Sequence, residues 1–206
     1  LDGKPVFASE STAFDLIGAN YEREINPGEM VVVSLKENFA VKCFRPFETG
    51  PLKRCVFEHV YFARPDSVVF SSTIYQTRKN LGKQLAKEHP PLDAEIVIPV
   101  PDSGVYAAIG YSEFSKLPFE MGIIRSHYIG RTFIEPKQSI RDLGVKLKLN
   151  PIAQIVREKS IVVVDDSLVR GTTSKKLIQH LRNSGARKVH LRISAPPTAH
   201  SCFYGI

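Results

Sequence analysis

Two adjacent carboxylates, Asp165 and Asp166, follow four aliphatic residues in the stretch IVVVDDSLVRGTTS, residues 161–174. Four aliphatic residues without polar alternation are typical of a strand that is buried on both faces, as in a parallel sheet covered by helices. Such sheets bind ligands at the carboxyl ends of their strands, where both acids are expected. Because neighbouring strand side chains point to opposite faces, the two carboxylates can bind different hydroxyl groups of one ligand or share a hydrated cation.

A turn rich in hydroxyl groups follows the acids and opens a predicted helix over residues 173–183. Its residues are Arg170, Gly171, Thr172, Thr173 and Ser174. Free backbone N–H groups, the positive end of the helix dipole and three hydroxyl groups can bind a phosphate here. Alternatively, Thr172 or Thr173 is an ordinary helix cap and the acids are solvated. We favour a site for a phosphorylated sugar, because a ribose diol and a divalent cation would offset the repulsion between the carboxylates.

This stretch resembles the phosphoribosyl pyrophosphate (PRPP) signature of the type I phosphoribosyltransferases. The resemblance implies that Asp165 and Asp166 engage the ribose hydroxyls and that the turn from Arg170 to Ser174 binds the 5′-phosphate. It also implies that Ser167 binds PRPP. Two further stretches are similar to the amidophosphoribosyltransferases, also called glutamine PRPP amidotransferases: CVFEHVYFARPDS at residues 55–67 and YIGRTFIEPKQSIRDLGVKLKLN at residues 128–150. Residues 4–33 resemble the last part of that family's glutaminase domain.

The resemblance implies an α/β fold of the type I phosphoribosyltransferase class over residues 55–206, with the carboxyl-terminal part of that domain missing. Residues 1–54 would be a connector and a remnant of the N-terminal-nucleophile glutaminase domain. The implied reaction transfers ammonia derived from glutamine to PRPP, giving 5-phosphoribosylamine, glutamate and pyrophosphate, which is the first step of de novo purine (IMP) synthesis. The nucleophilic cysteine of the glutaminase domain is missing, so we expect the 206-residue chain to release no glutamate from glutamine. The full-length protein should have both halves.

The order of apolar patterns beyond residue 54 supports this fold class. We predict helices over residues 72–88 and 103–116, strands over 94–99 and 119–124, a short helix over 139–149, and a last strand around residues 189–193. In the helix over 173–183, Leu177, Ile178 and Leu181 should be buried, and Gly185 should end it. Strands that alternate with helices indicate a parallel sheet with right-handed connections. Residues 30–35 are predicted as a further strand.

A second candidate anion site lies in the stretch IPVPDSG, residues 98–104. Ser103 and Gly104 follow a buried strand and precede a helix, which is a suitable position for binding an anion. The alternative is a proline-rich turn in which Asp102 or Ser103 caps the helix. The family resemblance favours the first interpretation and implies that this loop binds pyrophosphate. It also implies that Ser103, Asp165 and Asp166 are the magnesium-linked residues, with Mg²⁺ as a cofactor.

Residues 125–137, RSHYIGRTFIEPK, show little amphipathic pattern and are predicted to form a loop. In the resembled family the matching loop closes over bound PRPP, and such closure excludes water from an activated donor. Arg125, Arg131 and Lys137 are candidates to bind the pyrophosphate oxygens, with Arg131 as a catalytic cation. A solvated basic loop is the alternative.

The three cysteines, Cys43, Cys55 and Cys202, are too sparse for a disulfide framework, and their spacing alone indicates reduced intracellular thiols. One branch of the resembled family carries a [4Fe-4S] cluster on four cysteines. Cys55 and Cys202 match two of them, so the resemblance implies two further ligands beyond residue 206. The present chain alone cannot complete a site of four thiolates.

Composition agrees with an enzyme that binds a polyanionic small molecule. The net charge is +7, but the basic residues are scattered rather than gathered in the stripe that nucleic-acid binding favours. No apolar run approaches the roughly 18 residues of a membrane span. We therefore expect neither nucleic acid nor membrane as a partner, and a location in the cytoplasm, or in the plastid stroma if the source is a plant. The resemblance adds PRPP and glutamine or ammonia as substrates, purine nucleotides as inhibitors and a homotetramer for the full-length protein.

Two other functions share the same donor site. A nucleobase phosphoribosyltransferase would leave residues 4–33 and the stretch 128–150 without an explanation. A PRPP-sensing regulator would need a helix-turn-helix motif or a concentrated basic patch, and neither is evident in the sequence.

Overall fold

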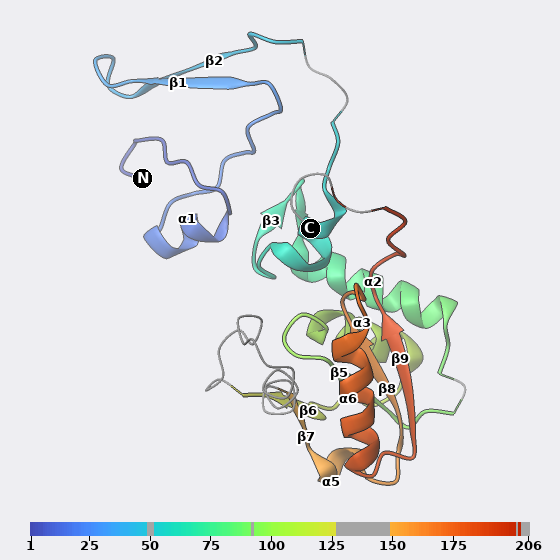
Figure 1. The fold of residues 1–206 in the computed structure, drawn as a ribbon. Helices are drawn as coiled ribbons and strands as arrows, with labels where there is room; N and C mark the ends of the chain where they lie inside the picture. The colour runs from blue at the N-terminus through green and yellow to red at the C-terminus, as the bar shows by residue number, and fades with distance from the viewer. Residues whose placement is uncertain (49–51, 92, 127–148, 201, 203–206) are drawn as a thin grey trace, which may run out of the picture. The chain divides into compact units, whose positions relative to one another are not determined.

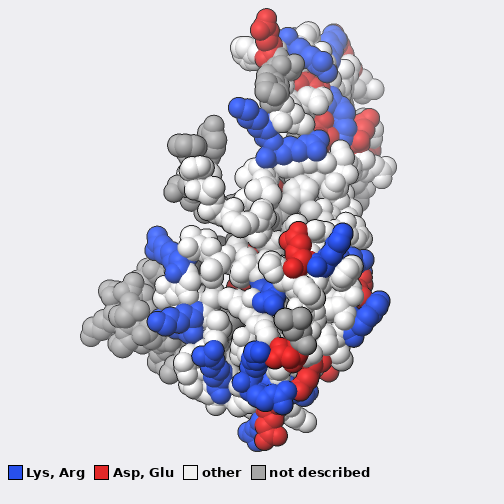
Figure 2. Space-filling view, turned by 90° about the vertical axis from the view of Figure 1, so that its right-hand side faces the viewer, with Lys and Arg blue, Asp and Glu red and all other residues white. Residues whose placement is uncertain are grey.

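The computed structural model describes residues 1–206 except 49–51, 92, 127–148, 201 and 203–206 (Figure 1). The chain forms two compact units, Leu1–Gln76 and Thr77–Ile206. The predicted boundary near Arg54 separates the segment that resembles a glutaminase domain from the segment that resembles a phosphoribosyltransferase domain. This boundary stays a prediction. Within the described residues, no helix is both long and apolar enough to cross a membrane. On the face that Figure 2 shows, Lys and Arg side chains are interspersed with acidic and uncharged ones.

The first unit contains one short helix, an antiparallel hairpin and a second small hairpin that follows a π-helical turn. The elements are α1 (Thr12–Ile17), β1 (Met30–Ser34), β2 (Ala40–Phe44), η1 (Glu58–Phe62), β3 (Val68–Val69) and β4 (Ser72–Thr73). The prediction of a strand from residue 30 is confirmed by β1. Ser11 Oγ accepts a hydrogen bond from the Val68 N–H at 2.8 Å, and Ser67 Oγ donates to the Glu10 carboxylate at 3.0 Å. These two bonds hold segments from either side of the predicted boundary together in one unit.

The second unit is built on a parallel sheet of β5 (Ile96–Pro99), β8 (Ser160–Asp165) and β9 (Lys188–Ile193), in the order β5-β8-β9. The central strand β8 is buried from Ser160 to Val164, which confirms the prediction drawn from its four aliphatic residues. Since β8 has a strand on each side and helices above and below, its backbone and side chains are both removed from water.

The two faces of the sheet are covered by different helices (Figure 1). Ile161 and Val163 of β8 pack in one core with Leu177 and Leu181 of α6 (Thr172–Asn183). Val162 and Val164 pack in the other core, with α2 (Ile74–Glu88) and α3 (Val105–Ser115). Ile178 is only partly buried, because it lies at the margin of this face of α6. Gly185 has the left-handed φ of 97° expected just after a helix end.

A small antiparallel pair, β6 (Ile123–Arg125) and β7 (Leu149–Pro151), lies beside the main sheet and is followed by the short α5 (Ala153–Val156). The predicted strand over 119–124 is confirmed only at its end, since Phe119 forms just an isolated bridge with Val97. Most of the predicted helix over 139–149 lies outside the described residues. Leu149 was wrongly included in it, because this residue pairs with Arg125 as the first residue of β7.

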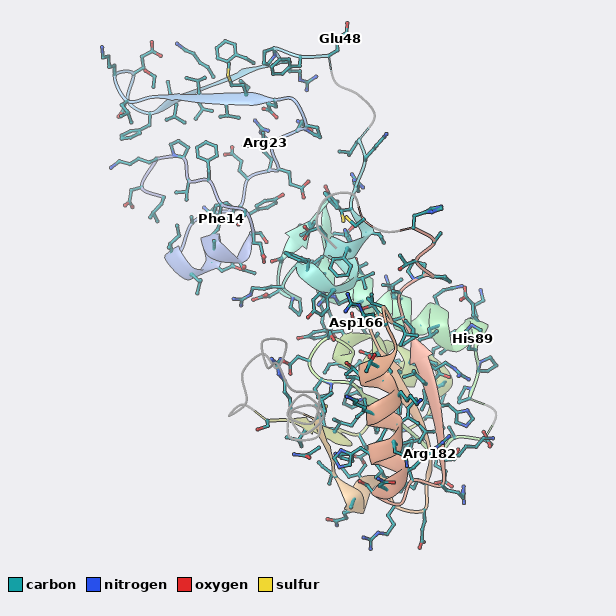
Figure 3. All side chains as sticks on the ribbon, viewed as in Figure 1. Phe14, Arg23, Glu48, His89, Asp166 and Arg182 are labelled. Atoms are coloured by element: carbon teal, nitrogen blue, oxygen red, sulfur yellow. The ribbon has the colours of Figure 1, made fainter. Side chains whose placement is uncertain are left out.

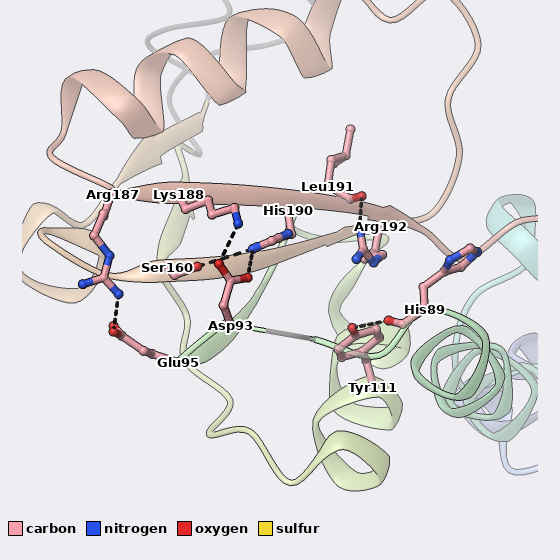
Figure 4. A network of polar contacts seen from close by, with 10 residues as sticks. All are labelled: His89, Asp93, Glu95, Tyr111, Ser160, Arg187, Lys188, His190, Leu191 and Arg192. Atoms are coloured by element: carbon pink, nitrogen blue, oxygen red, sulfur yellow. Dashed lines mark hydrogen bonds and ion pairs between the residues drawn. The ribbon is translucent and has the colours of Figure 1, made fainter.

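Charged side chains near the amino end of β9 pair with residues that precede β5 (Figure 4). Lys188 Nζ and His190 Nε2 lie 2.6 and 2.9 Å from the Asp93 carboxylate, and Arg187 pairs with Glu95 at 2.7 Å. The hydrogen bond from Lys188 is the main cause of the lowered pKa of Asp93. These ion pairs connect the first and last strands of the sheet in its described part.

Helices α2 and α3 approach each other closely through two glycines. A Cβ atom on Gly82 would clash with the carbonyl group of Ala107, and one on Gly110 would clash with that of Lys79. Lys79 and Lys83 of α2 also pair with Glu113 of α3, at 2.5 and 3.1 Å. This contact fixes the position of α2 relative to α3, and therefore relative to the loop that precedes α3.

We predict that Gly82→Ala destabilises the fold, although Ala is the better helix former. The added methyl group has no space against the Ala107 carbonyl, and overpacking of this kind costs about 1–3 kcal/mol. Urea denaturation measures the change in the free energy of unfolding, with Lys87→Ala, at an exposed position of the same helix, as the control. A Gly82→Ala protein as stable as the wild type would show that the helices can separate without cost.

Candidate functional site

The two acids lie together at the carboxyl end of β8, as the sequence predicts. Asp166 is 6% exposed and Asp165 is partly buried; Figure 3 labels Asp166. The Asp166 N–H donates to Asp165 Oδ1 at 3.0 Å. The backbone carbonyls of Asp165 and Asp166 accept hydrogen bonds from the N–H groups of Ser194 and Ala195, at 3.0 and 2.9 Å. Their backbone is thus held by the segment that follows β9.

Both oxygens of the Asp166 carboxylate accept hydrogen bonds from hydroxyl groups. Ser103 Oγ donates to Oδ1 at 2.7 Å, and Ser167 Oγ donates to Oδ2 at 2.6 Å. Ser103 belongs to the loop between β5 and α3, and Ser167 to the loop after β8. The structure therefore brings together the two loops that the sequence analysis assigned to one site.

The surroundings of Asp165 destabilise the ionised form of its carboxyl group. Burial, and then the charge of the neighbouring Asp166, raise the pKa of Asp165 to about 7, from an ordinary value of 3.8. A cation bound to the pair would favour the ionised form. The set of carboxylates and hydroxyls consists of hard oxygen ligands, which fit Mg²⁺.

The loop before α3 is tightly bound to the end of β8, and Gly104 is central to it. A Cβ atom at this position would meet the carbonyl oxygens of Val164 and Val100. The Gly104 N–H already donates to the Val100 carbonyl at 2.9 Å. Gly104 thus acts here by allowing close packing, and its N–H does not point to a ligand in this structure. Binding of PRPP by Ser103 and Gly104 stays a prediction.

Side-chain caps, the simpler explanation for both loops, are not observed. Neither α3 nor α6 has a side-chain hydrogen bond at its cap. The Asp102 side chain instead forms an ion pair with Arg125 of β6, and the peptide bond between Pro101 and Asp102 is cis. Arg125 is thereby placed next to the Ser103 loop.

The amino end of α6 is open to an incoming group. Gly171 occupies the cap position in the left-handed conformation, with φ 70°, and the first intrahelical bond runs from Lys175 N–H to the Gly171 carbonyl. Thr172 and Thr173 are exposed, whereas Ser174 is buried. Helix geometry leaves the N–H groups before Lys175 without intrahelical acceptors, which suits a phosphate.

The roles of four predicted site residues, Arg131, Lys137, Cys55 and Cys202, stay predictions. Arg131 and Lys137 lie outside the described residues. Cys55 and Cys202 are exposed and belong to different compact units. Among the described residues, no group of three or more His, Cys, Asp or Glu side chains could hold a metal ion. Two thiols do not suffice for an iron–sulfur cluster.

The sequence analysis missed one charged residue of the site, Arg78 of α2. It is only 4% exposed. Burial lowers its pKa, and interactions with Asp166 and then with Tyr106 partly offset this effect. The signal was present in the sequence: Arg78 lies four residues after Ile74, four before Gly82 and seven before Leu85, all buried positions. A charged residue on the buried face of a helix indicates a specific partner.

No protein-family model matches the chain. Amidophosphoribosyltransferase 1, chloroplastic, of Arabidopsis thaliana is 53% identical over 206 residues, and the amidophosphoribosyltransferase of Rhizobium etli is 50% identical over 208. Along its whole length, this chain is similar to one section of the amidophosphoribosyltransferases. It spans 36% and 42%, respectively, of the length of these two relatives.

Solved structures agree with this resemblance. The glutamine PRPP amidotransferase of B. subtilis, solved in complex with ADP and GMP, is 46% identical, with a TM-score of 0.87 over 96% of this chain and 43% of its own. A second structure, described as the allosteric regulatory enzyme of purine biosynthesis, matches equally well. The prediction of a parallel α/β fold similar to that of the amidotransferases is confirmed.

We predict that Asp165→Asn alters the pH dependence of stability. Between pH 3.8, the ordinary pKa, and about 7, the folded chain retains a proton that the unfolded chain has released. The free energy of unfolding of the wild type therefore falls as the pH rises towards 7 and then levels off. Asn cannot ionise, so the variant should gain stability relative to the wild type at neutral pH, by a few kcal/mol at most.

Urea unfolding between pH 4 and 8 measures this difference, with the exposed Glu120→Gln as the control. A difference between variant and wild type that does not change with pH would show that Asp165 titrates normally.

Proposed function

We propose that the protein carrying this chain is an amidophosphoribosyltransferase, which transfers ammonia derived from glutamine to PRPP and yields 5-phosphoribosylamine, glutamate and pyrophosphate. The observation that carries the proposal is the hydrogen-bonded cluster of Ser103, Asp166 and Ser167, with Asp165 beside it, at the carboxyl edge of a parallel sheet. The cluster lies in a chain about half identical to enzymes of that name. This section would perform the phosphoribosyl transfer.

In this mechanism the residues bind and orient the donor rather than act as nucleophiles. Asp165 and Asp166 hold the ribose hydroxyls and offset the positive charge that develops on the anomeric carbon. Ser167 and the turn from Arg170 to Ser174 bind the 5′-phosphate, where the open end of α6 attracts negative charge. The carbon–nitrogen bond to ammonia forms as the bond to the pyrophosphate oxygen breaks, and the attacking nitrogen then loses a proton to water or to the released pyrophosphate.

The leaving pyrophosphate needs compensation of its negative charge. Ser103 and Gly104 with Arg125, Arg131 and Lys137 would hold it, and bound Mg²⁺ would neutralise part of its charge. Ser103, Asp165 and Asp166 would hold that ion through their oxygen atoms. Catalysis therefore depends on positioning and on electrostatic stabilisation.

Further properties of the full-length protein follow as proposals from its relatives. The B. subtilis enzyme was solved with ADP and GMP, which supports inhibition by purine nucleotides here. We propose a homotetramer, and a [4Fe-4S] cluster for which Cys55 and Cys202 would supply two of four ligands. Plant relatives are named chloroplastic, so the location would be the plastid stroma in a plant and the cytoplasm otherwise.

Pyrophosphate release from PRPP tests the reaction. We expect the full-length protein to release pyrophosphate with ammonium or glutamine, only when magnesium is present, and to lose at least about 100-fold in rate in the Asp165→Asn, Asp166→Asn double variant. Glu120→Gln, at an exposed position, is the matched control for loss of an acid.

Two results would move the assignment to another function. Release driven only by a free purine or pyrimidine would identify a nucleobase phosphoribosyltransferase. Binding of PRPP without turnover, together with DNA binding that persists against a competing polyanion, would identify a regulator.

A further inference from the structure

We infer that Arg78 is a positioning residue for the reaction: from its buried place on α2 it holds the Asp166 carboxylate in the orientation that receives the ribose and the cation. The inference rests on the proposed function, because it assumes that Asp166 binds the ribose of PRPP. Arg78 would act through Asp166 and would not itself touch PRPP.

Burial is the first observation that supports this role. Arg78 is 4% exposed and Asp166 is 6% exposed. Burial lowers the pKa of Arg78, and the charge of Asp166 partly offsets this effect. A buried guanidinium and a buried carboxylate each lose hydration, and each is tolerated only when another group compensates. The position of one charge is therefore tied to that of the other.

The hydrogen bonds to the Asp166 carboxylate come only from neutral groups among the contacts described. Ser103 and Ser167 hold one carboxylate oxygen each, but they are neutral donors on two different loops. A permanent charge on a rigid helix fixes the carboxylate in a way that hydroxyl groups on loops cannot, because guanidinium remains protonated at all relevant pH values.

The helix that carries Arg78 is itself held against the site. Gly110 of α3 packs on the carbonyl of Lys79, the residue next to Arg78, and Gly82 of α2 packs on Ala107. Tyr106, in the first turn of α3, also interacts with Arg78. The helix that carries Arg78 is thus packed on α3, and the loop before α3 supplies the Ser103 hydroxyl that binds Asp166.

The variants Arg78→Met and Arg78→Lys of the full-length protein test the inference. We would measure ammonium-driven pyrophosphate release and PRPP binding, each at several magnesium concentrations. Met preserves the length of the side chain without charge, and we expect a loss of roughly 10- to 100-fold in kcat/KM for PRPP, with a higher magnesium requirement. Lys retains the charge but not the planar geometry, and should recover part of the loss. Lys87→Met removes an exposed cation from the same helix and should behave as the wild type.

A double-variant cycle with Asp166→Asn separates action through Asp166 from direct contact with PRPP. If Arg78 acts through Asp166, Arg78→Met should weaken PRPP binding far less in the Asp166→Asn background than in the wild type. The Arg78→Met, Asp166→Asn double variant also removes both buried charges, so it should melt at a higher temperature than Arg78→Met alone. The cycle remains measurable through Arg78→Lys if Arg78→Met does not fold.

The outcomes distinguish this inference from the proposed function. Wild-type turnover with unchanged kinetics in Arg78→Met overturns the inference alone, as does a purely additive cycle, which would mean that Arg78 binds PRPP itself. A lower melting temperature with unchanged KM and magnesium requirement would show a merely structural residue. A wild-type protein that neither binds nor turns over PRPP overturns the proposed function and the inference with it.

Discussion

The repulsion between two adjacent carboxylates at the carboxyl end of β8 is the constraint on which the rest of the site depends. Asp165 and Asp166 are partly or fully removed from water, where their charges are least screened. The two acids differ in their surroundings. Asp166 accepts hydrogen bonds from two hydroxyl groups and has an electrostatic interaction with Arg78. The pKa of Asp165 is raised to about 7. One acid is thus fixed in place, and the other is left to respond to a ligand.

Packing around the pair follows from this requirement. The donors for Asp166 come from separate loops, so those loops must be held at fixed distances from β8. Gly104 allows the loop before α3 to pack directly on the Val164 carbonyl, and the Val100 N–H donates to that same carbonyl at 2.8 Å. The close contact of α2 with α3 then places Arg78. Glycines at these positions therefore serve the geometry of the site as much as the stability of the fold.

Sequence patterns predicted the parts of this arrangement that local physics decides. The four aliphatic residues of β8 favoured a doubly buried strand, and the alternation of strands with helices indicated a parallel sheet. The pairing of Ser103 with Asp166 depends on tertiary contact, and only the family resemblance indicated it. The hydrogen bond from the Gly104 N–H to the Val100 carbonyl was missed, although it is local. The spacing of Arg78 from Ile74, Gly82 and Leu85 indicated that Arg78 is buried, but its place near Asp166 depends on how two helices approach the end of β8. No local pattern specifies that approach.

The two ends of the sheet show how stability and function are divided. Near the amino end of β9, opposite charges pair at short distances, as Lys188 and His190 do with Asp93. At the carboxyl end of β8, like charges are brought together and only partly compensated. Two acids placed together there cost stability, and such local violations of the rules for stable folds are typical of functional sites. A ligand that binds only the folded state stabilises it, so any cation or hydroxyl-bearing ligand that offset this repulsion would gain binding free energy from its relief.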